Sequence, residues 1–213
     1  MTTIYFVRHS APFVEIDNYE DYKNVSWSEY NKNMILSGVG EENAKKLCNV
    51  EELKNIDEIY ASNSFRAIGT AKYIAEYNNL KIKLDPRINE RDFGIEKLSE
   101  LPDDFTKLSF DDKTFKVNNG ESLNDVDKRL KSFVTDILNK NNKSIVIVLH
   151  GIILLSYLKD VCEIFEFDGK NFDIQINNKT ILKGTPNNPS IYKVEYDSNK
   201  NVVDVNTVLL WKI

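Results

Sequence analysis

Residues 144–151 read Ser-Ile-Val-Ile-Val-Leu-His-Gly, an apolar run rich in β-branched residues that leads directly to His150. A second run of this kind, Thr-Ile-Tyr-Phe-Val-Arg over residues 3–8, leads to His9. Such runs predict buried strands, and open α/β sheets bind ligands at the carboxyl ends of their strands. The chain has two histidines, so the sequence predicts that both imidazoles lie at one rim of one sheet.

The composition indicates an ordinary globular protein. With 213 residues, 41% of them hydrophobic, the chain is long enough to bury a sizeable core, and we expect a single domain over residues 1–213. The net charge of −5, without a concentrated basic segment, argues against nucleic acid as a partner. No apolar stretch approaches the length of a membrane span, so we expect no membrane partner. These patterns leave the oligomeric state open.

The cysteine content predicts a cytoplasmic protein without a metal site. Cys48 and Cys162 lie far apart, which favours two free thiols in a reducing compartment over a disulfide framework. The chain enters a strand within three residues and shows no signal-peptide pattern. Two cysteines and two histidines are too few for a thiolate zinc site. No Gly-x-Gly-x-x-Gly follows the first strand, so we expect neither a dinucleotide nor any other cofactor.

Strand and helix signals alternate along the chain. Strands are predicted at residues 3–7, 57–61, 82–84 and 144–150, and helices at 36–48, 65–77, 123–138 and 152–161. Strands at 191–196 and 202–210 flank a polar turn and predict a late antiparallel hairpin. The order predicts an α/β three-layer sandwich, in which helices cover both faces of a mainly parallel central sheet. Residues 11–35 and 91–120 are polar and poorly periodic, which is typical of loops or a lid.

Charged side chains follow the predicted strands. Arg8 offers a planar fork suited to phosphate oxygens, and Arg66 lies in the first turn of a predicted helix, where free backbone N–H groups favour the same anion. Glu90 comes shortly after the third strand, within reach of the same cleft. Two imidazoles, two guanidiniums and a carboxylic acid suit in-line displacement at phosphorus.

Each of these residues also has a structural interpretation. A histidine at a strand end can be a satisfied core residue, and Arg66 can be an ordinary helix-surface residue. Other acids lie near Glu90 in the sequence, namely Asp92, Glu96 and Glu121. Glu121 and Ser122 also fit the start of the helix at 123–138, where Ser122 and Asp125 resemble a capping box.

Five motifs occur in a fixed order along the chain. They are Arg8-His9-Ser10, residues 62–71 (Ser-x-x-x-Arg-Ala-x-x-Thr-Ala), residues 90–94 (Glu-Arg-Asp-Phe-Gly), Gly120-Glu121-Ser122 and His150-Gly151, with Leu36-Ser37-Gly38 as a helix opener. In this order they resemble the histidine phosphatase superfamily, which includes cofactor-dependent phosphoglycerate mutases and many small phosphatases. Any single triplet is weak, whereas five ordered motifs on the expected elements form a strong signal.

The resemblance implies a two-step phosphoryl transfer. His9 would attack the phosphoryl group and become a phosphohistidine, and Glu90 would protonate the leaving alcohol and then activate water. Arg8, Arg66 and His150 would hold the phosphoryl oxygens. Since His9 must be neutral to attack, the surrounding cations should disfavour its protonation. We expect His9 in a solvent-reachable cleft.

Three further residues complete or alter the implied phosphate site. Gly151 permits close backbone approach, and Ser10, which stands where the family has glycine, offers its hydroxyl as a further phosphate contact. Glu15 stands where many members carry a phosphate-contacting asparagine, and a carboxylate there would repel the anion unless it turns away.

The sequence favours hydrolysis of a small phosphorylated metabolite. A mutase must hold a second anionic group, yet residues 92–128 contain no arginine. Two alternatives remain: a mutase that uses a bisphosphorylated primer, and a catalytically idle module that binds a phosphorylated ligand.

Overall fold

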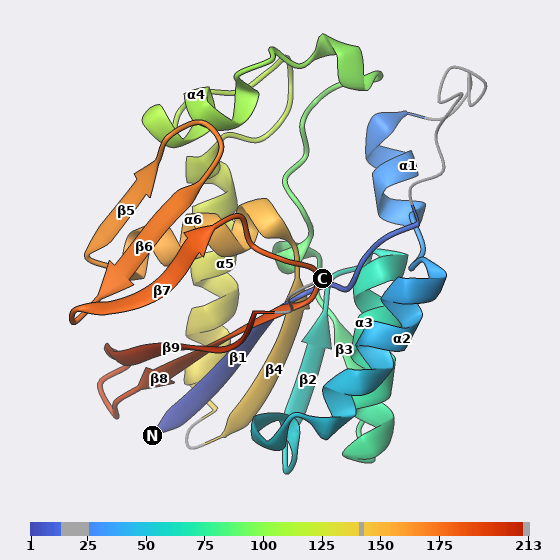
Figure 1. Cartoon of the computed structure of the whole chain (residues 1–213), viewed down its shortest axis with the longest axis vertical. Coiled ribbons are helices and arrows are strands. Elements are labelled where there is room, and N and C mark those ends of the chain that lie inside the picture. Colours follow the sequence, from blue (N-terminus) through green and yellow to red (C-terminus); the bar gives the residue numbers. More distant parts are fainter. Residues whose placement is uncertain (14–25, 141–142, 211–213) are drawn as a thin grey trace.

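A six-stranded sheet forms the centre of the protein in this computed structural model, which describes residues 1–13, 26–140 and 143–210 (Figure 1). The sheet contains, in spatial order, β3 (Ile82–Leu84), β2 (Glu58–Ala61), β4 (Ser144–Leu149), β1 (Thr2–Arg8), β8 (Ser190–Tyr196) and β9 (Val202–Leu210). The first four strands in this order run parallel, and β8 and β9 form the antiparallel hairpin. The predicted mainly parallel sheet with its late hairpin is confirmed.

Helices cover both faces of this sheet, as predicted (Figure 1). The helices are α1 (Trp27–Asn33), α2 (Gly38–Lys46), α3 (Phe65–Tyr77), α4 (Phe105–Asp111), α5 (Leu123–Leu138) and α6 (Gly151–Val161). Helix α3 packs on one face with α2 against it, and α5 and α6 pack on the other. Short 3-10 turns occur at Leu47–Asn49, Glu51–Leu53, Pro86–Ile88 and Leu98–Glu100. Within the described residues, no helix is long and apolar enough to span a membrane.

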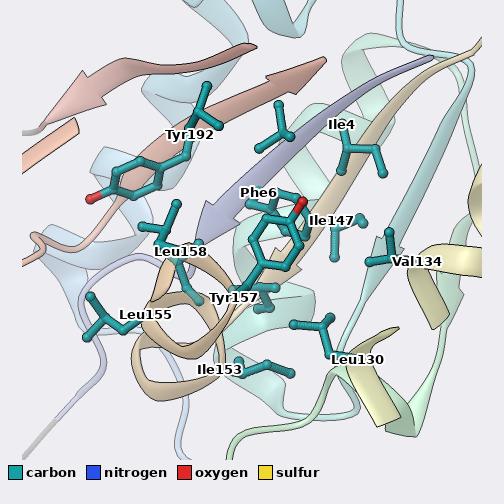
Figure 2. Packing of buried hydrophobic residues seen from close by; sticks show 14 of the residues in the cluster. Ile4, Phe6, Leu130, Val134, Ile147, Ile153, Leu155, Tyr157, Leu158 and Tyr192 are labelled. Atoms are coloured by element: carbon teal, nitrogen blue, oxygen red, sulfur yellow. The ribbon is translucent and has the colours of Figure 1, made fainter. Parts of the chain in front are cut away.

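The alternation of side chains along β1 explains why both faces are covered. Ile4 and Phe6 point to the α5 and α6 face, where Figure 2 shows them in one cluster with Leu130 and Leu158. Val7 belongs to the cluster on the opposite face, beneath α3. Because successive side chains of a strand point to opposite faces, an uninterrupted apolar run requires cover on both sides.

A second, three-stranded antiparallel sheet was not predicted. It consists of β5 (Ile164–Phe167), β6 (Phe172–Ile176) and β7 (Lys179–Gly184). Its signal is nevertheless present, because every second residue of β6 is buried and two asparagines with positive φ, Asn177 and Asn178, form the turn to β7. The helices α1 and α4 also fall in segments that we expected to be loops.

Two smaller expectations are confirmed. Ser122 accepts a hydrogen bond from the backbone of Asp125, whose side chain accepts from Ser122 in return, which is the predicted capping box of α5. Cys48 and Cys162 are both free thiols.

Candidate active site

The parallel pairing of β1 with β4 brings the two histidines together. Arg8 is paired with Leu149 across the two strands, so the residues that follow, His9 and His150, leave the sheet side by side. The backbone N–H of His9 donates to the Leu149 carbonyl at 3.0 Å, and the imidazole centroids are 5.1 Å apart. The expected solvent-reachable position of His9 is wrong, because its exposed fraction is 6% and that of His150 is zero.

The hydrogen bonds of His9 define its tautomer. Its Nδ1 lies 2.7 Å from the carbonyl oxygen of Ser10, which can only accept, so Nδ1 carries the proton. The other ring nitrogen, Nε2, therefore has a free lone pair, and it accepts from Nε of Arg66 at 3.0 Å. Asn188 donates from Nδ2 to the His9 carbonyl at 2.8 Å and fixes the backbone of the same residue. The imidazole is thus held with Nε2 as its nucleophilic atom.

His150 has the opposite tautomer. Its Nδ1 accepts from Nη2 of Arg66 at 3.0 Å, so its proton is on Nε2, which donates to Oγ of Ser62 at 2.7 Å. The Arg66 guanidinium therefore spans the lone pairs of both imidazoles. Its remaining nitrogen, Nη1, donates to the backbone carbonyl of Asn31 in α1.

Burial and the two arginines keep both imidazoles neutral. The pKa of His9 lies well below its ordinary value of 6.5, first because burial disfavours the charged ring and then because Arg66 and Arg8 repel a further positive charge. The pKa of His150 is lowered in the same way, by burial and then by Arg66 and the other cations around it. Burial also lowers the pKa of Arg66 to about 10, which leaves its guanidinium charged at neutral pH.

Arg8 lies over the start of α6. Its Nη1 donates to the carbonyl of Pro186, and its buried Nε has no hydrogen-bond partner among the described residues. The guanidinium packs on Gly151 so closely that a Cβ at that position would come within 3.3 Å of it. A side chain at position 151 would therefore crowd the guanidinium, which would have to move by a few tenths of an ångström to make room.

Glu90 lies at the amino-terminal end of α6. One carboxylate oxygen accepts from the backbone N–H of Arg91 at 3.0 Å, and the other faces the N–H of Ile152 at 3.4 Å. A helix amino terminus favours a negative charge. The charge of Glu90 raises the pKa values of Arg8 and Arg66 against the effect of burial. The structure thus brings Glu90 together with the arginines and imidazoles that the sequence singled out.

The sequence profile of the histidine phosphatase superfamily (branch 1) matches residues 4–204. The chain belongs to this superfamily. Phosphoserine phosphatase 1 of Hydrogenobacter thermophilus is 31% identical over 125 residues, which cover 55% of this chain and 59% of that relative's length. The putative phosphoserine phosphatase 2 of the same organism is 26% identical over 166 residues, which cover 71% of this chain and 74% of that protein.

Solved structures share the histidine phosphatase fold over nearly the whole chain. A mycobacterial glucosyl-3-phosphoglycerate phosphatase superposes with a TM-score of 0.66, 17% identity and 96% coverage of both chains. A phosphoglycerate mutase from Bacillus anthracis gives a TM-score of 0.66 at 21% identity, covering 97% of this chain and 92% of its own. At these identities the similarity establishes the fold and no more.

A cleft of about 330 Å³ opens beside Glu90 in this histidine phosphatase. Its lining residues come from α1, the start of α3, the segment around Glu90 and α5, and are Trp27, Ser28, Asn31, Lys32, Ser64, Pro86, Asn89, Glu90, Arg91, Asp92, Phe93, Glu121 and Arg129. Neither histidine lines it, because α1 closes over the arginine between them through the Asn31 carbonyl. The backbone N–H of Trp27 donates to the Glu96 carbonyl at 3.1 Å, which joins α1 to the opposite wall.

Several predicted or competing residues have other partners. The backbone N–H of Ser10 donates to Thr70 Oγ1 at 2.9 Å and its hydroxyl donates to the Gly40 carbonyl at 2.8 Å, so neither group is free for a phosphate. Glu121, an acid that competes with Glu90 in the sequence, is paired with Arg129 at 2.7 Å. Glu15 lies outside the described residues.

Sequence reasoning missed Ser62 and Asn188, which both bond to the histidines. Ser62 follows β2 directly, as each histidine follows its own strand, so the strand-end rule that selected His9 and His150 also selects this serine. Asn188 lies two residues before β8, and no sequence pattern marked it as a residue of the site. In the parts of the chain that the structure describes, no cluster of three or more His, Cys, Asp or Glu residues has a metal-binding arrangement.

The lowered pKa values predict that neither ring is protonated at pH 5.5. Uniform ¹⁵N labelling and two-bond ¹H–¹⁵N spectra of the imidazoles test this directly, because the natural sequence has two histidines. Both rings should keep the nitrogen shifts of neutral imidazole from pH 7.5 to 5.5, whereas the unfolded chain should titrate near pH 6.5. The unfolded state then binds more protons, so these rings should lower stability progressively as the pH falls below 6.5. A ring that titrates near pH 6.5 in the folded protein would contradict this account of the site.

Proposed function

We propose that this chain is a phosphatase that hydrolyses a small phosphomonoester through a phosphohistidine on His9. The observation that carries the proposal is the fixed tautomer of His9, whose Nε2 lone pair is directed at the Arg66 guanidinium. A phosphoryl oxygen is a better acceptor for a guanidinium than a neutral imidazole, because it carries negative charge. Substrate would therefore draw the Arg66 hydrogen bond away from Nε2 and release the lone pair next to the phosphorus atom.

The proposed reaction has two displacements. In the first, Nε2 of His9 forms a bond to phosphorus while the bond to the leaving oxygen breaks, and Glu90 in its acid form gives that oxygen a proton. In the second, the Glu90 carboxylate takes a proton from water, whose oxygen attacks phosphorus and displaces Nε2. Arg8, Arg66 and His150 neutralise the charge of the transferred group in both steps. The lowered pKa of His9 supports this assignment, since the ring needs no deprotonation before attack.

The charges along the cleft favour hydrolysis over the mutase reaction. Three cationic residues line it, but Arg91 is only 2% exposed and donates to the Glu121 carbonyl, the Ser109 hydroxyl and the Phe115 carbonyl. Arg129 is paired with Glu121, which leaves Lys32 as the lining cation without an ion pair among the described residues. A bisphosphorylated primer would need more positive charge than this cleft offers.

A substrate panel tests the choice between phosphatase and mutase. Phosphoserine is its first member, because two relatives carry that activity in their names, followed by 3-phosphoglycerate and other small phosphomonoesters. We expect release of inorganic phosphate from at least one ester, at a rate that 2,3-bisphosphoglycerate does not increase. Isomerisation of 3-phosphoglycerate that depends on the primer, without net phosphate release, would favour the mutase instead.

The His9→Ala variant should lower kcat by about three orders of magnitude or more, because the nucleophile is lost. The wild-type protein, incubated briefly with ³²P-labelled substrate and quenched, should carry an acid-labile label that the variant lacks. Since His9 is buried, circular dichroism and urea unfolding must first establish that the variant is folded. A wild-type protein that turns substrate over without a labelled intermediate would exclude the phosphohistidine, and a protein with neither activity nor label would be a binding module.

The Glu90→Gln variant should slow the hydrolysis of alkyl phosphates far more than that of 4-nitrophenyl phosphate. An alkoxide needs a proton as it leaves, whereas 4-nitrophenolate is a stable leaving group. Asp92→Asn is the matched control, since this neighbouring acid lines the same cleft and its side chain accepts only from the Gly94 N–H among the described residues. Equal losses for both substrates in Glu90→Gln would assign the proton transfer to another acid.

A further inference from the structure

We infer that Ser62 is a positioning residue, whose hydroxyl oxygen fixes the tautomer of His150 and thereby the orientation of Arg66 against the nucleophilic nitrogen of His9. The inference rests on the proposed function, in which these three side chains surround the transferred phosphoryl group. Ser62 itself contacts neither the proposed cleft nor His9. Its effect on the reaction would pass through the imidazole of His150.

Ser62 is held rigidly at the end of β2. Its backbone N–H donates to the Val148 carbonyl of the neighbouring strand β4 at 3.1 Å, two residues before His150, and its side chain is fully buried. The backbone N–H of Ser64 lies 3.3 Å from the same hydroxyl oxygen. The first contact comes from β4 and the second from the turn into α3, so the position of Oγ is fixed independently of His150.

The proton position on His150 follows from its two neighbours. Arg66 can only donate, so the nitrogen that faces it must carry a lone pair, and the ring proton must reside on Nε2. A buried N–H group without an acceptor is costly, and Ser62 Oγ at 2.7 Å is the acceptor that the described residues supply. Without that oxygen, the ring can keep its bond to Arg66 only by leaving the buried Nε2–H unpaired. A ring that turns or moves its proton to avoid this cost loses the acceptor that Arg66 uses.

A chain of three hydrogen bonds transmits this constraint to the nucleophile. Ser62 Oγ accepts from His150 at 2.7 Å, His150 accepts from Arg66 Nη2 at 3.0 Å, and Arg66 Nε donates to His9 Nε2 at 3.0 Å. The guanidinium is planar and rigid, so its two donors cannot move independently. A displaced His150 therefore misaligns the donor that faces the attacking nitrogen.

Imidazole NMR of the phosphate-free protein tests the inference without reference to activity. The chain has two histidines, so two sets of ring signals are expected, one with the proton on Nδ1 for His9 and one with the proton on Nε2 for His150. In Ser62→Ala the His150 signals should move towards the other tautomer or a mixture, and kcat should fall roughly ten- to a hundredfold, as expected for a buried donor left unpaired. Ser62→Thr, which restores a hydroxyl, should recover the wild-type tautomer.

Ser156→Ala is the matched control. Ser156 is also a fully buried serine, and its hydroxyl bonds to Asp127 rather than to a histidine. This variant should lose comparable stability in urea unfolding while leaving the imidazole signals and kcat unchanged. A parallel change of imidazole signals in both variants would reduce Ser62 to a general structural role.

Two further results would overturn the inference. One is a wild-type spectrum in which the His150 proton resides on Nδ1. This measurement uses the wild-type protein alone, so it remains decisive even if Ser62→Ala does not fold. The other is a folded Ser62→Ala protein with an unchanged His150 tautomer and unchanged kcat. A wild-type protein that shows the expected tautomers but hydrolyses no ester in the panel would refute the proposed function and leave the assignment of Ser62 intact.

Discussion

The Arg66 guanidinium, held between two neutral imidazoles, is the interaction on which the site depends. Its exposed fraction is 3%, and an arginine so far from water is tolerated only when its N–H groups are satisfied. Nε, Nη1 and Nη2 find acceptors on His9, the Asn31 carbonyl and His150, and the nearby Glu90 carboxylate offsets part of the charge. The arrangement works only while both rings are uncharged, so the cation that lies between the histidines also helps to keep the Nε2 lone pair of His9 unprotonated.

The sheet supplies the geometry that this arginine requires. Parallel pairing of β1, β4 and β2 places His9, His150 and Ser62 at three adjacent strand ends, and α3 begins a few residues after Ser62 with Arg66 in its first turn. None of these positions depends on a long loop. The walls of the neighbouring cleft come instead from α1, the segment around Glu90 and α5.

Sequence patterns predicted the strand ends well because periodicity and burial act locally. The apolar runs before His9 and His150, and the capped helix that starts after Ser122, each carry their own signal, and the structure has them in place. The β5–β7 sheet was missed because its strands are short and half exposed, so their alternation is weak until a partner surface such as Phe110 of α4 is known. The hydrogen-bond partners of individual side chains were harder still to predict. No local sequence pattern indicates that the Ser10 hydroxyl donates to the Gly40 carbonyl. Likewise, no pattern near Arg91 indicates that its guanidinium donates to Ser109 and to the Glu121 carbonyl, because these hydrogen bonds join distant parts of the chain.

The position of β1 in the sheet has a consequence for biosynthesis. This strand is made before the other strands of the sheet, yet its neighbours on either side are β4 and β8, which leave the ribosome more than a hundred residues later. Asn188, which anchors the His9 backbone, belongs to the same late material. A nascent chain therefore carries β1 unpaired until these two strands have been made, with the hydrogen-bonding edges of β1 open to other chains. The pairing around β1 is complete only after the β8 region has left the exit tunnel, so early termination products lack this pairing and are liable to aggregate.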